Sequence, residues 1–447
     1  MRKMKDSGLQ WIGQIPEEWA AGRMKDVIGL LTDYTANGSF GDLAKNVQYL
    51  DDGFARLVRL TDLRENLTNA NGICIDEPTF NYLAKSKLKG GDILVANVGA
   101  YSGLFCEMPK VEYPCSLAPN MFLIRTNKRM IQHFLFYVGS SNFVWEQLIQ
   151  KAVSSAQPKL NKTDIKTTFL PIPPLAEQRR IADFLDEKCG EIDSIRSDVQ
   201  REIEILNDYK KSVITEAVTK GLNPNAKLKD SCIEWIGKIP DGWMIKRLGT
   251  LASSKPYSMV DGPFGSDMKN EEYVDEGIPI IQLTNIKPYY HNIETLKFIT
   301  EEKHKQLIRH TAEAGDIAIA KMMPAGRACI LSNKYHKYVV AADAIRFKVN
   351  ESNDNRFILY ALNTYCMTEC EIVSKGSTRI RISLEIARKL NLAVPPLSEQ
   401  KAIADYLDEK CSAIDATIAD KQKQLETLDE YKKSLIFEYV TGKKEVS

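Results

Sequence analysis

Apolar residues recur at steps of three and four along two long stretches of the chain. A Pro-Pro pair leads into each stretch, at 173–174 and 395–396, and Gly221 or Gly442 closes it, as suits the start and the end of a helix. This spacing predicts two amphipathic helices with a coiled-coil-like seam, each of about 45 residues and about 65–70 Å. The seam positions are Ile181, Leu185, Cys189, Ile192, Ile195, Val199, Ile203, Leu206 and Val213 in the first helix, and Ile403, Leu407, Cys411, Ile414, Ile418, Leu425, Leu428 and Leu435 in the second.

A lone helix of this length would leave its apolar stripe in water, so each helix needs a partner. The chain between the two stretches is long enough for a return path. We therefore expect the two helices to pack against each other as an antiparallel coiled coil. The alternative is that each helix serves to form a homodimer.

The two helical stretches are copies of each other. Residues 173–189 (PPLAEQRRIADFLDEKC) and 395–411 (PPLSEQKAIADYLDEKC) are identical at 13 of 17 positions. A second phrase is also repeated, because 11–19 (WIGQIPEEW) returns as 235–243 (WIGKIPDGW). Two repeated phrases, half a chain apart, indicate a tandem duplication. The tryptophan phrase marks where each half begins, and we expect it to form a packed strand or turn.

The segments between these phrases predict two α+β domains, because short apolar runs alternate with dense turn residues. We expect strands at 57–63 and 92–96 and a helix within 131–149. The second half echoes them at 281–286, at Gly315-Asp316-Ile317 and at 357–373. The repeated sequence motifs are retained while the residues between them differ, as expected of two domains that recognise different ligands. Drift after duplication would give the same pattern.

These features divide the chain into five parts. They are a first globular domain (1–155), a first helical region (156–222), a linker with the second opening motif (223–242), a second globular domain (243–375) and a second helical region (376–447).

The net charge of +1 conceals an uneven distribution. Residues 176–220 and 396–447 each carry a net charge of −3, which leaves +7 on the rest of the chain. Acidic helices joined to mildly basic globular parts permit a polyanionic partner for the globular parts alone.

Motifs for catalysis are missing from the sequence. We find no P-loop, no Asn/Asp-Pro-Pro-Tyr/Phe motif of amino-methylating DNA methyltransferases, no G-x-S-x-G and no H-E-x-x-H. The nine cysteines lack CxxC spacing, so we expect neither zinc nor disulfides, and a reducing, cytoplasmic location. No apolar run is long enough for a membrane span, and the N-terminal residues lack the apolar core of a signal peptide.

Basic and aromatic residues near predicted turns are the candidates for nucleic-acid contact, because Arg and Lys pair with guanine or neutralise phosphate. Taken singly, each is more often a solvated surface charge. These candidates are Arg56, Arg59, Arg64, Lys85, Lys87, Lys89 and Tyr101 in the first half, and Tyr257, Lys269, Lys287, Tyr289, Tyr290, Lys321 and Arg327 in the second. The stretch 376–382, with Ser377, Thr378, Arg379 and Arg381, and its counterpart 154–160, with Lys159, are candidates to position a phosphate backbone.

The motifs together resemble a known family. Pro-Pro-Leu-x-Glu-Gln-x-x-Ile-Ala-Asp-[Phe/Tyr]-Leu-Asp-Glu-Lys, found twice, the Trp-Ile-Gly-x-Ile-Pro-x-x-Trp openings, Gly-Asp-Ile and Gly-Ser-Thr-x-x-x-Ile resemble the specificity subunit of type I restriction–modification systems. The first half departs from this pattern, with Ser154-Ser155-Ala156 in place of Gly-Ser-Thr.

The resemblance implies a non-catalytic, DNA-binding subunit for host defence, with two target-recognition domains that each read half of a bipartite, asymmetric site. It implies that the helices space the domains and dock two methyltransferase subunits, and that a translocase–nuclease (restriction) subunit joins them. S-adenosylmethionine, ATP and Mg are then expected on partner chains and no cofactor on this one. The alternatives are a coiled-coil scaffold that binds only proteins, and a nuclease or methyltransferase with unrecognised motifs.

Overall fold

The computed structural model describes residues 2–64, 67, 72–152, 158–263, 267–373 and 381–446, apart from the side chain of Arg64. The chain forms two compact units, and we describe each by itself. Unit 1 comprises residues 1–200 and 423–447, and unit 2 comprises residues 201–422. Each unit therefore contains parts of both repeats.

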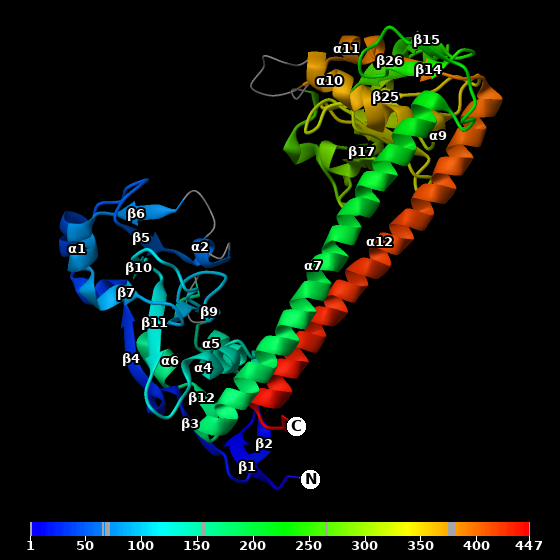
Figure 1. The fold of residues 1–447 in the computed structure, drawn as a ribbon. Helices are drawn as coiled ribbons and strands as arrows, with labels where there is room; N and C mark the ends of the chain where they lie inside the picture. The colour runs from blue at the N-terminus through cyan, green and yellow to red at the C-terminus, as the bar shows by residue number, and fades with distance from the viewer. Residues whose placement is uncertain are drawn as a thin grey trace. The chain divides into compact units, whose positions relative to one another are not determined.

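Both predicted long helices are present, as α7 (Leu175–Lys220) and α12 (Leu397–Val440) (Figure 1). Each ends at the expected glycine, because Gly221 and Gly442 have φ values of +74° and +70°. This left-handed conformation ends a helix at little cost only when the residue has no Cβ.

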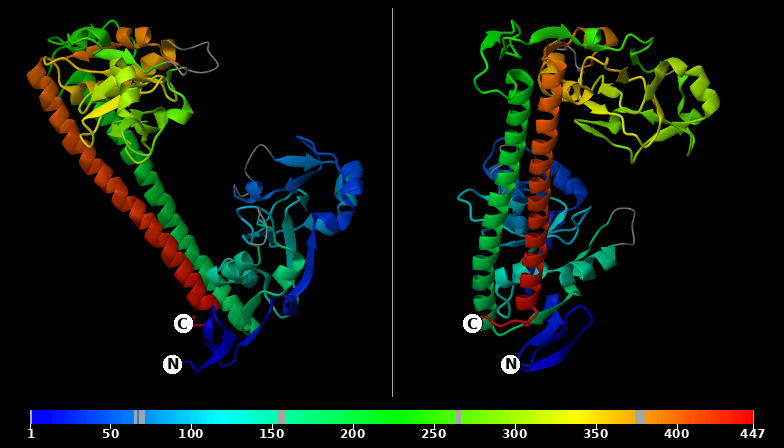
Figure 2. Two further views of the ribbon diagram at one scale, coloured as in Figure 1. Left: turned by 180° about the vertical axis from the view of Figure 1, so that it is seen from behind. Right: turned by 90° about the vertical axis from the view of Figure 1, so that its right-hand side faces the viewer.

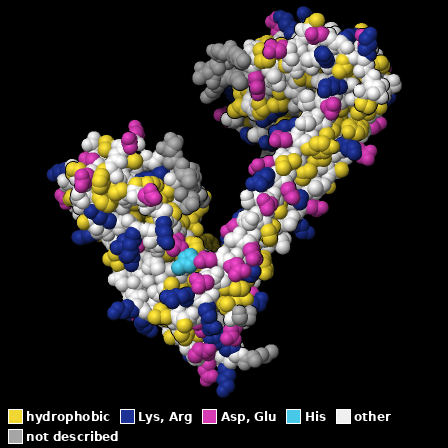
Figure 3. Space-filling model, viewed as in Figure 1, with side chains coloured by type: hydrophobic (Ala, Val, Ile, Leu, Met, Phe, Trp, Pro, Cys, Tyr) yellow, Lys and Arg dark blue, Asp and Glu magenta, His cyan; other side chains and the backbone are white. Residues whose placement is uncertain are grey.

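The two helices lie side by side and antiparallel, as predicted (Figure 2). In unit 1, Lys432 pairs with Asp193 at 2.7 Å. In unit 2, Lys210 pairs with Asp415 at 2.6 Å. These two ion pairs are the same pair in the two repeats, at an offset of 222 residues. Acidic and basic side chains are interspersed over the exposed faces of both helices (Figure 3).

The seam between the helices is apolar. Its buried members are Ile181, Leu185, Cys189, Ile192, Val199, Ile203, Ile403, Leu407, Cys411, Ile414 and Leu435, and its half-buried members are Leu206, Val213, Ile418, Leu425 and Leu428. Ile195 is an exception, because its side chain is 46% exposed. Arg196 takes the step between Ile192 and Val199 instead and pairs with Asp429 at 2.7 Å.

Unit 1 places two four-stranded sheets and several short helices before α7. Their bounds are β1 Met4–Leu9, β2 Gly13–Pro16, β3 Ala20–Arg23, η1 Met24–Asp26, β4 Ile28–Asp33, η2 Tyr34–Asn37, α1 Phe40–Asn46, β5 Ala55–Val58, α2 Leu60–Arg64, β6 Ile73–Ile75, α3 Glu77–Tyr82, η3 Ala84–Ser86, β7 Lys87–Leu88, β8 Ile93–Ala96, β9 Phe105–Glu107, β10 Cys115–Leu117, β11 Met121–Thr126, α4 Gln132–Gly139, α5 Asn142–Ala152, α6 Lys162–Lys166 and β12 Phe169–Ile172.

Unit 2 has a similar, but not identical, series of elements before α12. Its bounds are β13 Leu228–Asp230, β14 Lys238–Pro240, β15 Met244–Arg247, η4 Leu248–Leu251, β16 Met259–Asp261, η6 Asn270–Glu272, β17 Ile278–Ile281, η7 Leu283–Asn285, β18 Ile286–Lys287, β19 Tyr290–His291, β20 Lys297–Ile299, α8 Glu301–Gln306, η8 Ile308–His310, β21 Thr311–Glu313, β22 Ile317–Ala320, β23 Ala328–Ile330, β24 Lys337–Val340, β25 Ala344–Phe347, α9 Asn355–Ala361, η9 Leu362–Cys366, α10 Met367–Val373, α11 Leu384–Lys389 and β26 Asn391–Val394.

The sheets of the two units have the same topology. The order β6-β5-β10-β7 in unit 1 corresponds to β20-β17-β24-β21 in unit 2, and β4-β11-β8-β9 corresponds to β16-β25-β22-β23. The one parallel pairing among these strands also corresponds, because β5 runs parallel to β10 and β17 parallel to β24. The predicted α+β class is therefore correct, and the divergent segments share one scaffold.

Three local expectations need correction. The strand expected over 57–63 ends at Val58, because the Asp62 carboxylate accepts a hydrogen bond from the Arg59 backbone N–H at 2.8 Å and starts α2. The single helix expected within 131–149 is two helices, α4 and α5. The polar stretch that follows Leu222, expected to be a linker, contributes β13 to a hairpin with β14.

The main hydrophobic core of each unit combines both repeats. In unit 1, Trp19 of the opening motif and Leu185 near the start of α7 belong to the same core as Val440 at the end of α12. In unit 2, Trp243 and Leu407 share a core with Val218 at the end of α7. The end of each long helix thus completes the core that begins with the other repeat.

The repeated glutamine of the Pro-Pro motif joins each domain to its helix. Gln178 accepts a hydrogen bond from the Ile131 N–H at 2.7 Å, just before α4, and donates one to the Arg129 carbonyl at 2.9 Å. Gln400 accepts the equivalent bond from the Asp354 N–H at 2.9 Å, just before α9. The motif is therefore a structural joint.

A second joint differs between the units. In unit 1, His133 of α4 lies between Glu107 and Asp186, 2.6 Å from each carboxylate. In unit 2, Arg356 takes this place on α9, 2.7 Å from Asp408. The hydrogen bond to Glu107 is the largest cause that raises the pKa of His133 to about 9, and the bond to Asp186 adds to it, although burial acts in the opposite direction.

We predict that Val440→Ala and Val218→Ala each destabilise the unit whose core is begun by the other repeat. Both side chains are fully buried and occupy equivalent positions in the repeats. Val440→Ala lowers the unfolding free energy of unit 1 by about 2 kcal/mol, and Val218→Ala does so for unit 2, because each truncation leaves a cavity. Hydrogen exchange of amides in β8 and β22 measures the two units separately.

Ile205→Ala is the control for this experiment, because Ile205 is 61% exposed, and its effect stays within about 0.5 kcal/mol. If Val440→Ala speeds hydrogen exchange in unit 2 alone, the end of α12 does not belong to the core of unit 1.

We also predict that unit 1 loses stability as the pH rises through about 9. The pKa of His133 is higher in the folded than in the unfolded state, so its contribution is complete below about pH 6.5 and disappears above the folded value. Because the pair is partly exposed, the loss is about 1 kcal/mol. His133→Arg, which copies unit 2, removes this dependence. Thermal unfolding between pH 7.5 and 10 measures this loss of stability. If the wild type and the variant lose the same stability over that range, His133 is not the cause.

Candidate nucleic-acid interface

Two of the predicted basic contacts hold a buried carboxylate. Arg59 pairs with Asp62 at 2.8 Å, and the Asp62 side chain is fully buried. Arg56 approaches the same carboxylate at 3.5 Å and donates to the Leu67 carbonyl at 3.0 Å. The hydrogen bond to Asp62 raises the pKa of Arg59. Both arginines therefore stabilise the start of α2.

Three other predicted contacts gather in one groove of unit 1. Lys85, Lys87 and Lys89 line a groove of about 520 Å³ together with Arg125 and Lys162. Lys85 and Lys89 are exposed, and the Lys87 ammonium lies 4.1 Å from the centre of the Phe80 ring. Five basic residues from three segments of the chain thus line one concave surface.

The repeated Gly-Asp-Ile phrase fixes the strands beside this groove. Asp92 is buried and pairs with Arg125 of β11 at 2.7 Å, and Asp316 pairs with Arg346 of β25 at 2.8 Å. Burial raises the pKa of Asp316. These buried ion pairs hold the same two strands together in each unit.

Several further candidates are exposed on the surface of their own unit, outside the basic groove. They are Tyr257, Lys269, Lys287 and Tyr290 in unit 2, and Tyr101 and Lys159 in unit 1.

Three candidates of the second half are buried or half-buried and make contacts within their own unit. The Tyr289 ring packs against the core, and burial raises the pKa of its hydroxyl to about 12. Lys321 pairs with Asp261 at 3.1 Å, and its side chain is 9% exposed. Arg327 donates to the Leu283 carbonyl at 2.7 Å, and burial lowers its pKa.

The loop candidates are only partly described. Ser377, Thr378 and Arg379 lie outside the described residues, as do Ser154–Ala156 of the counterpart and the Arg64 side chain. Arg381 is described, is half exposed, and pairs with Asp343 at 2.7 Å.

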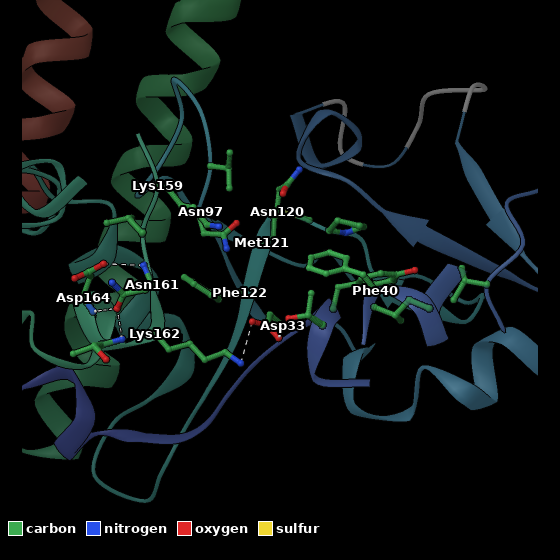
Figure 4. A pocket seen from close by; sticks show the side chains of 18 of the residues that line it. Asp33, Phe40, Asn97, Asn120, Met121, Phe122, Lys159, Asn161, Lys162 and Asp164 are labelled. Atoms are coloured by element: carbon green, nitrogen blue, oxygen red, sulfur yellow. Dashed lines mark hydrogen bonds and ion pairs between the residues drawn. The ribbon is translucent and has the colours of Figure 1, made fainter. Parts of the chain in front are cut away.

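A large pocket lies in unit 1, next to the basic groove. Its volume is about 1080 Å³, and it shares Lys162 with that groove. Figure 4 shows Asn97 and Asn120 between Lys159 on one side and Phe40 on the other. Phe40 is 83% exposed, and the side-chain amide oxygen (Oδ1) of Asn97 is buried without a hydrogen-bond partner among the described residues. Amides and an exposed aromatic ring are groups that recognise base edges and faces.

The sequence analysis did not include Asn97, Asn120 or Lys162 among the candidates. A signal existed for Asn97, because GDILVAN (91–97) aligned with GDIAIAK (315–321) places Asn97 opposite Lys321. Nothing in the sequence marks Asn120 or Lys162.

The described part of the chain contains no group of three or more His, Cys, Asp or Glu side chains arranged to bind a metal ion. Among the same residues, none of the helices combines the length and the apolar character needed to cross a membrane.

Comparison with protein families gives two matches to one model. Residues 16–204 and 240–427 each match the family described as "Type I restriction modification DNA specificity domain". The two matched segments correspond to the two repeats and leave out the opening hairpin strands β1 and β13.

Individual proteins agree along nearly the whole chain. A Methanocaldococcus jannaschii protein named as the specificity subunit of type I restriction enzyme MjaX is 28% identical, covering 97% of this chain and 95% of its own. A solved structure described as the basis of complex assembly and conformational transition of the type I R-M system has a TM-score of 0.69 at 18% identity, covering 96% and 99% of the two chains. The HsdS subunit from Thermoanaerobacter tengcongensis has a TM-score of 0.50 at 17% identity, covering 96% and 98%.

Proposed function

This chain belongs to the type I restriction modification DNA specificity domain family, and we propose that each unit reads one half of a bipartite, asymmetric DNA target. It is the specificity subunit of a type I restriction–modification system, with two target-recognition domains and no catalytic role of its own. One observation carries the proposal of two half-sites. The units keep the same strand order and the same buried Asp–Arg pair, while the side chains at the strand ends differ.

The basic groove of unit 1 supports a phosphate contact. Lys85, Lys87 and Lys89 lie in one groove with two further cations, and phosphate contacts position a protein on DNA without selecting a sequence. The adjoining pocket, with its amides, supplies groups that select bases. In unit 2, Arg381 is the exposed cation at the corresponding strand end.

Catalysis then belongs to partner chains. We assign adenine methylation with S-adenosylmethionine to two methyltransferase subunits, and ATP-driven, Mg-dependent cleavage to restriction subunits. The repeated phrase Tyr-Lys-Lys-Ser supports two equivalent docking sites, because Tyr209 and Tyr431 occupy the same position in the repeats and are 54% and 57% exposed. We place the complex in the cytoplasm, with its DNA target.

Methylome sequencing tests the proposal. Deletion of the gene abolishes one bipartite methylation motif of the host. Exchange of residues 24–168 for those of a relative changes one half of that motif and leaves the other half intact. These boundaries keep β3 and β12 in place, because the Met24 N–H donates to the Thr168 carbonyl at 2.7 Å and closes the exchanged segment. A motif altered in both halves, from a stable complex, would refute one half-site per unit.

The basic groove gives a second prediction. Lys85→Ala, Lys87→Ala and Lys89→Ala together lower the slope of log binding constant against log salt by roughly 0.9 for each phosphate that the groove no longer neutralises, with base preference unchanged. Fluorescence anisotropy on duplex DNA at several salt concentrations measures the slope.

The control for this prediction removes the same charge from the helices, through Lys188→Ala, Lys211→Ala and Lys433→Ala. If both triple variants keep the wild-type slope, the groove does not contact phosphate.

A further inference from the structure

Three polar positions of unit 1 are set by backbone contacts at the ends of its strands. The Asn97 N–H, just after β8, donates to the Asn120 carbonyl at 3.1 Å, just before β11. The Leu160 N–H donates to the Asn97 carbonyl at 2.8 Å, and Val98 forms a β-bridge with Lys159. Asn97, Asn120 and Lys159 are thereby brought to one edge of the pocket (Figure 4).

Unit 2 makes the same backbone contacts with different residues. The Lys321 N–H donates to the Asp343 carbonyl at 2.8 Å, and the Ile382 N–H donates to the Lys321 carbonyl at 2.9 Å. Met322 forms the corresponding bridge with Arg381. The structure therefore equates Asn97 with Lys321, Asn120 with Asp343 and Lys159 with Arg381 in a single recognition set.

The chemistry of this set differs between the units. Unit 1 carries two amides and a lysine, and the side-chain amide oxygen (Oδ1) of Asn97 is buried without a partner among the described residues. Unit 2 carries two cations and a carboxylate, with Arg381 paired to Asp343. The same backbone frame thus presents two neutral amides and one cation in unit 1, and ion pairs in unit 2.

We propose that this recognition set determines which bases each unit reads. The inference rests on the proposed DNA-reading function and deepens it. An asparagine amide both donates and accepts, which matches the N6 donor and N7 acceptor of adenine, so the exposed Asn120 directs unit 1 toward an A·T pair. Arg381 matches the O6 and N7 acceptors of guanine, with Asp343 to orient it.

Within unit 2 the three positions do not contribute equally. The Lys321 ammonium donates hydrogen bonds to the Asp261 carboxylate at 3.1 Å and to the Ala342 carbonyl at 3.2 Å, and the Lys321 side chain is nearly buried. Arg381 and Asp343 are 51% and 37% exposed. In unit 2 these two side chains therefore recognise the bases, while Lys321 positions the strand ends.

The test exchanges nearly isosteric side chains between the units. Asn120→Asp and, in a separate chain, Asp343→Asn preserve shape at exposed positions while they change which hydrogen bonds are possible. Asn142→Asp makes the same chemical change at the exposed start of α5, outside the pocket, and serves as the matched control. Thermal unfolding of each purified chain confirms that it folds.

Each variant is assembled with its methyltransferase and used to select DNA from a library randomised over both half-sites. We expect Asn120→Asp to change the preferred base at one position of one half-site, with binding to the original site reduced roughly 5- to 150-fold. Asp343→Asn changes one position of the other half-site. Asn142→Asp selects the wild-type sequence.

Selection of the wild-type bases by both folded variants overturns this inference, and so does a change confined to the spacer or spread over both halves. Either result leaves the proposed function standing if the wild-type chain still selects a bipartite site. Failure of the wild-type complex to select any site would refute the proposed function itself.

Discussion

The fold depends on one packing constraint, which is that the end of each long helix must be buried in the core begun by the other repeat. Val440, at the end of α12, is fully buried together with Trp19 and Leu185 of the first repeat. Val218 has the same role in unit 2. An amphipathic helix of this length gains most of its stability from such packing. The antiparallel pairing of α7 and α12 is thus required by both cores, and their ion pairs only add to it.

This constraint separates stability from recognition. The glutamine joints at Gln178 and Gln400 and the buried carboxylates Asp92 and Asp316 hold the strands in a fixed frame. Asn120 and Lys159 at the strand ends are exposed, so substitution there costs little stability. The domains are therefore free to diverge where they would meet DNA while the helices and joints stay nearly identical.

The sequence was informative where a pattern is local or repeated. Seam spacing and the closing glycines defined both helices, and the repeated phrases identified the units' common order. Prediction failed where a distant partner decides the role of a side chain. Tyr289 and Lys321 were candidates for contact with nucleic acid, and in the structure the Tyr289 ring lies against the core and Lys321 pairs with Asp261. Likewise, nothing in the sequence brings Asn120 beside Asn97, because their contact is made between strands that are far apart in the chain.

The arrangement around Gly221 and Gly442 bears on how such a chain arose. Gly221 lies against Pro240 and Trp243, and a short covalent connection leads from it to β13. Gly442 lies against Pro16 and Trp19 in the same way, but there the two segments belong to opposite ends of the sequence. The contact between the helix-closing glycine and the opening motif is thus non-covalent in unit 1, whereas in unit 2 the same two segments are joined by a short stretch of chain. A chain with one domain and one helix would lack the helix end that fills its core, so the duplication supplies within one polypeptide the two helix ends that both cores require.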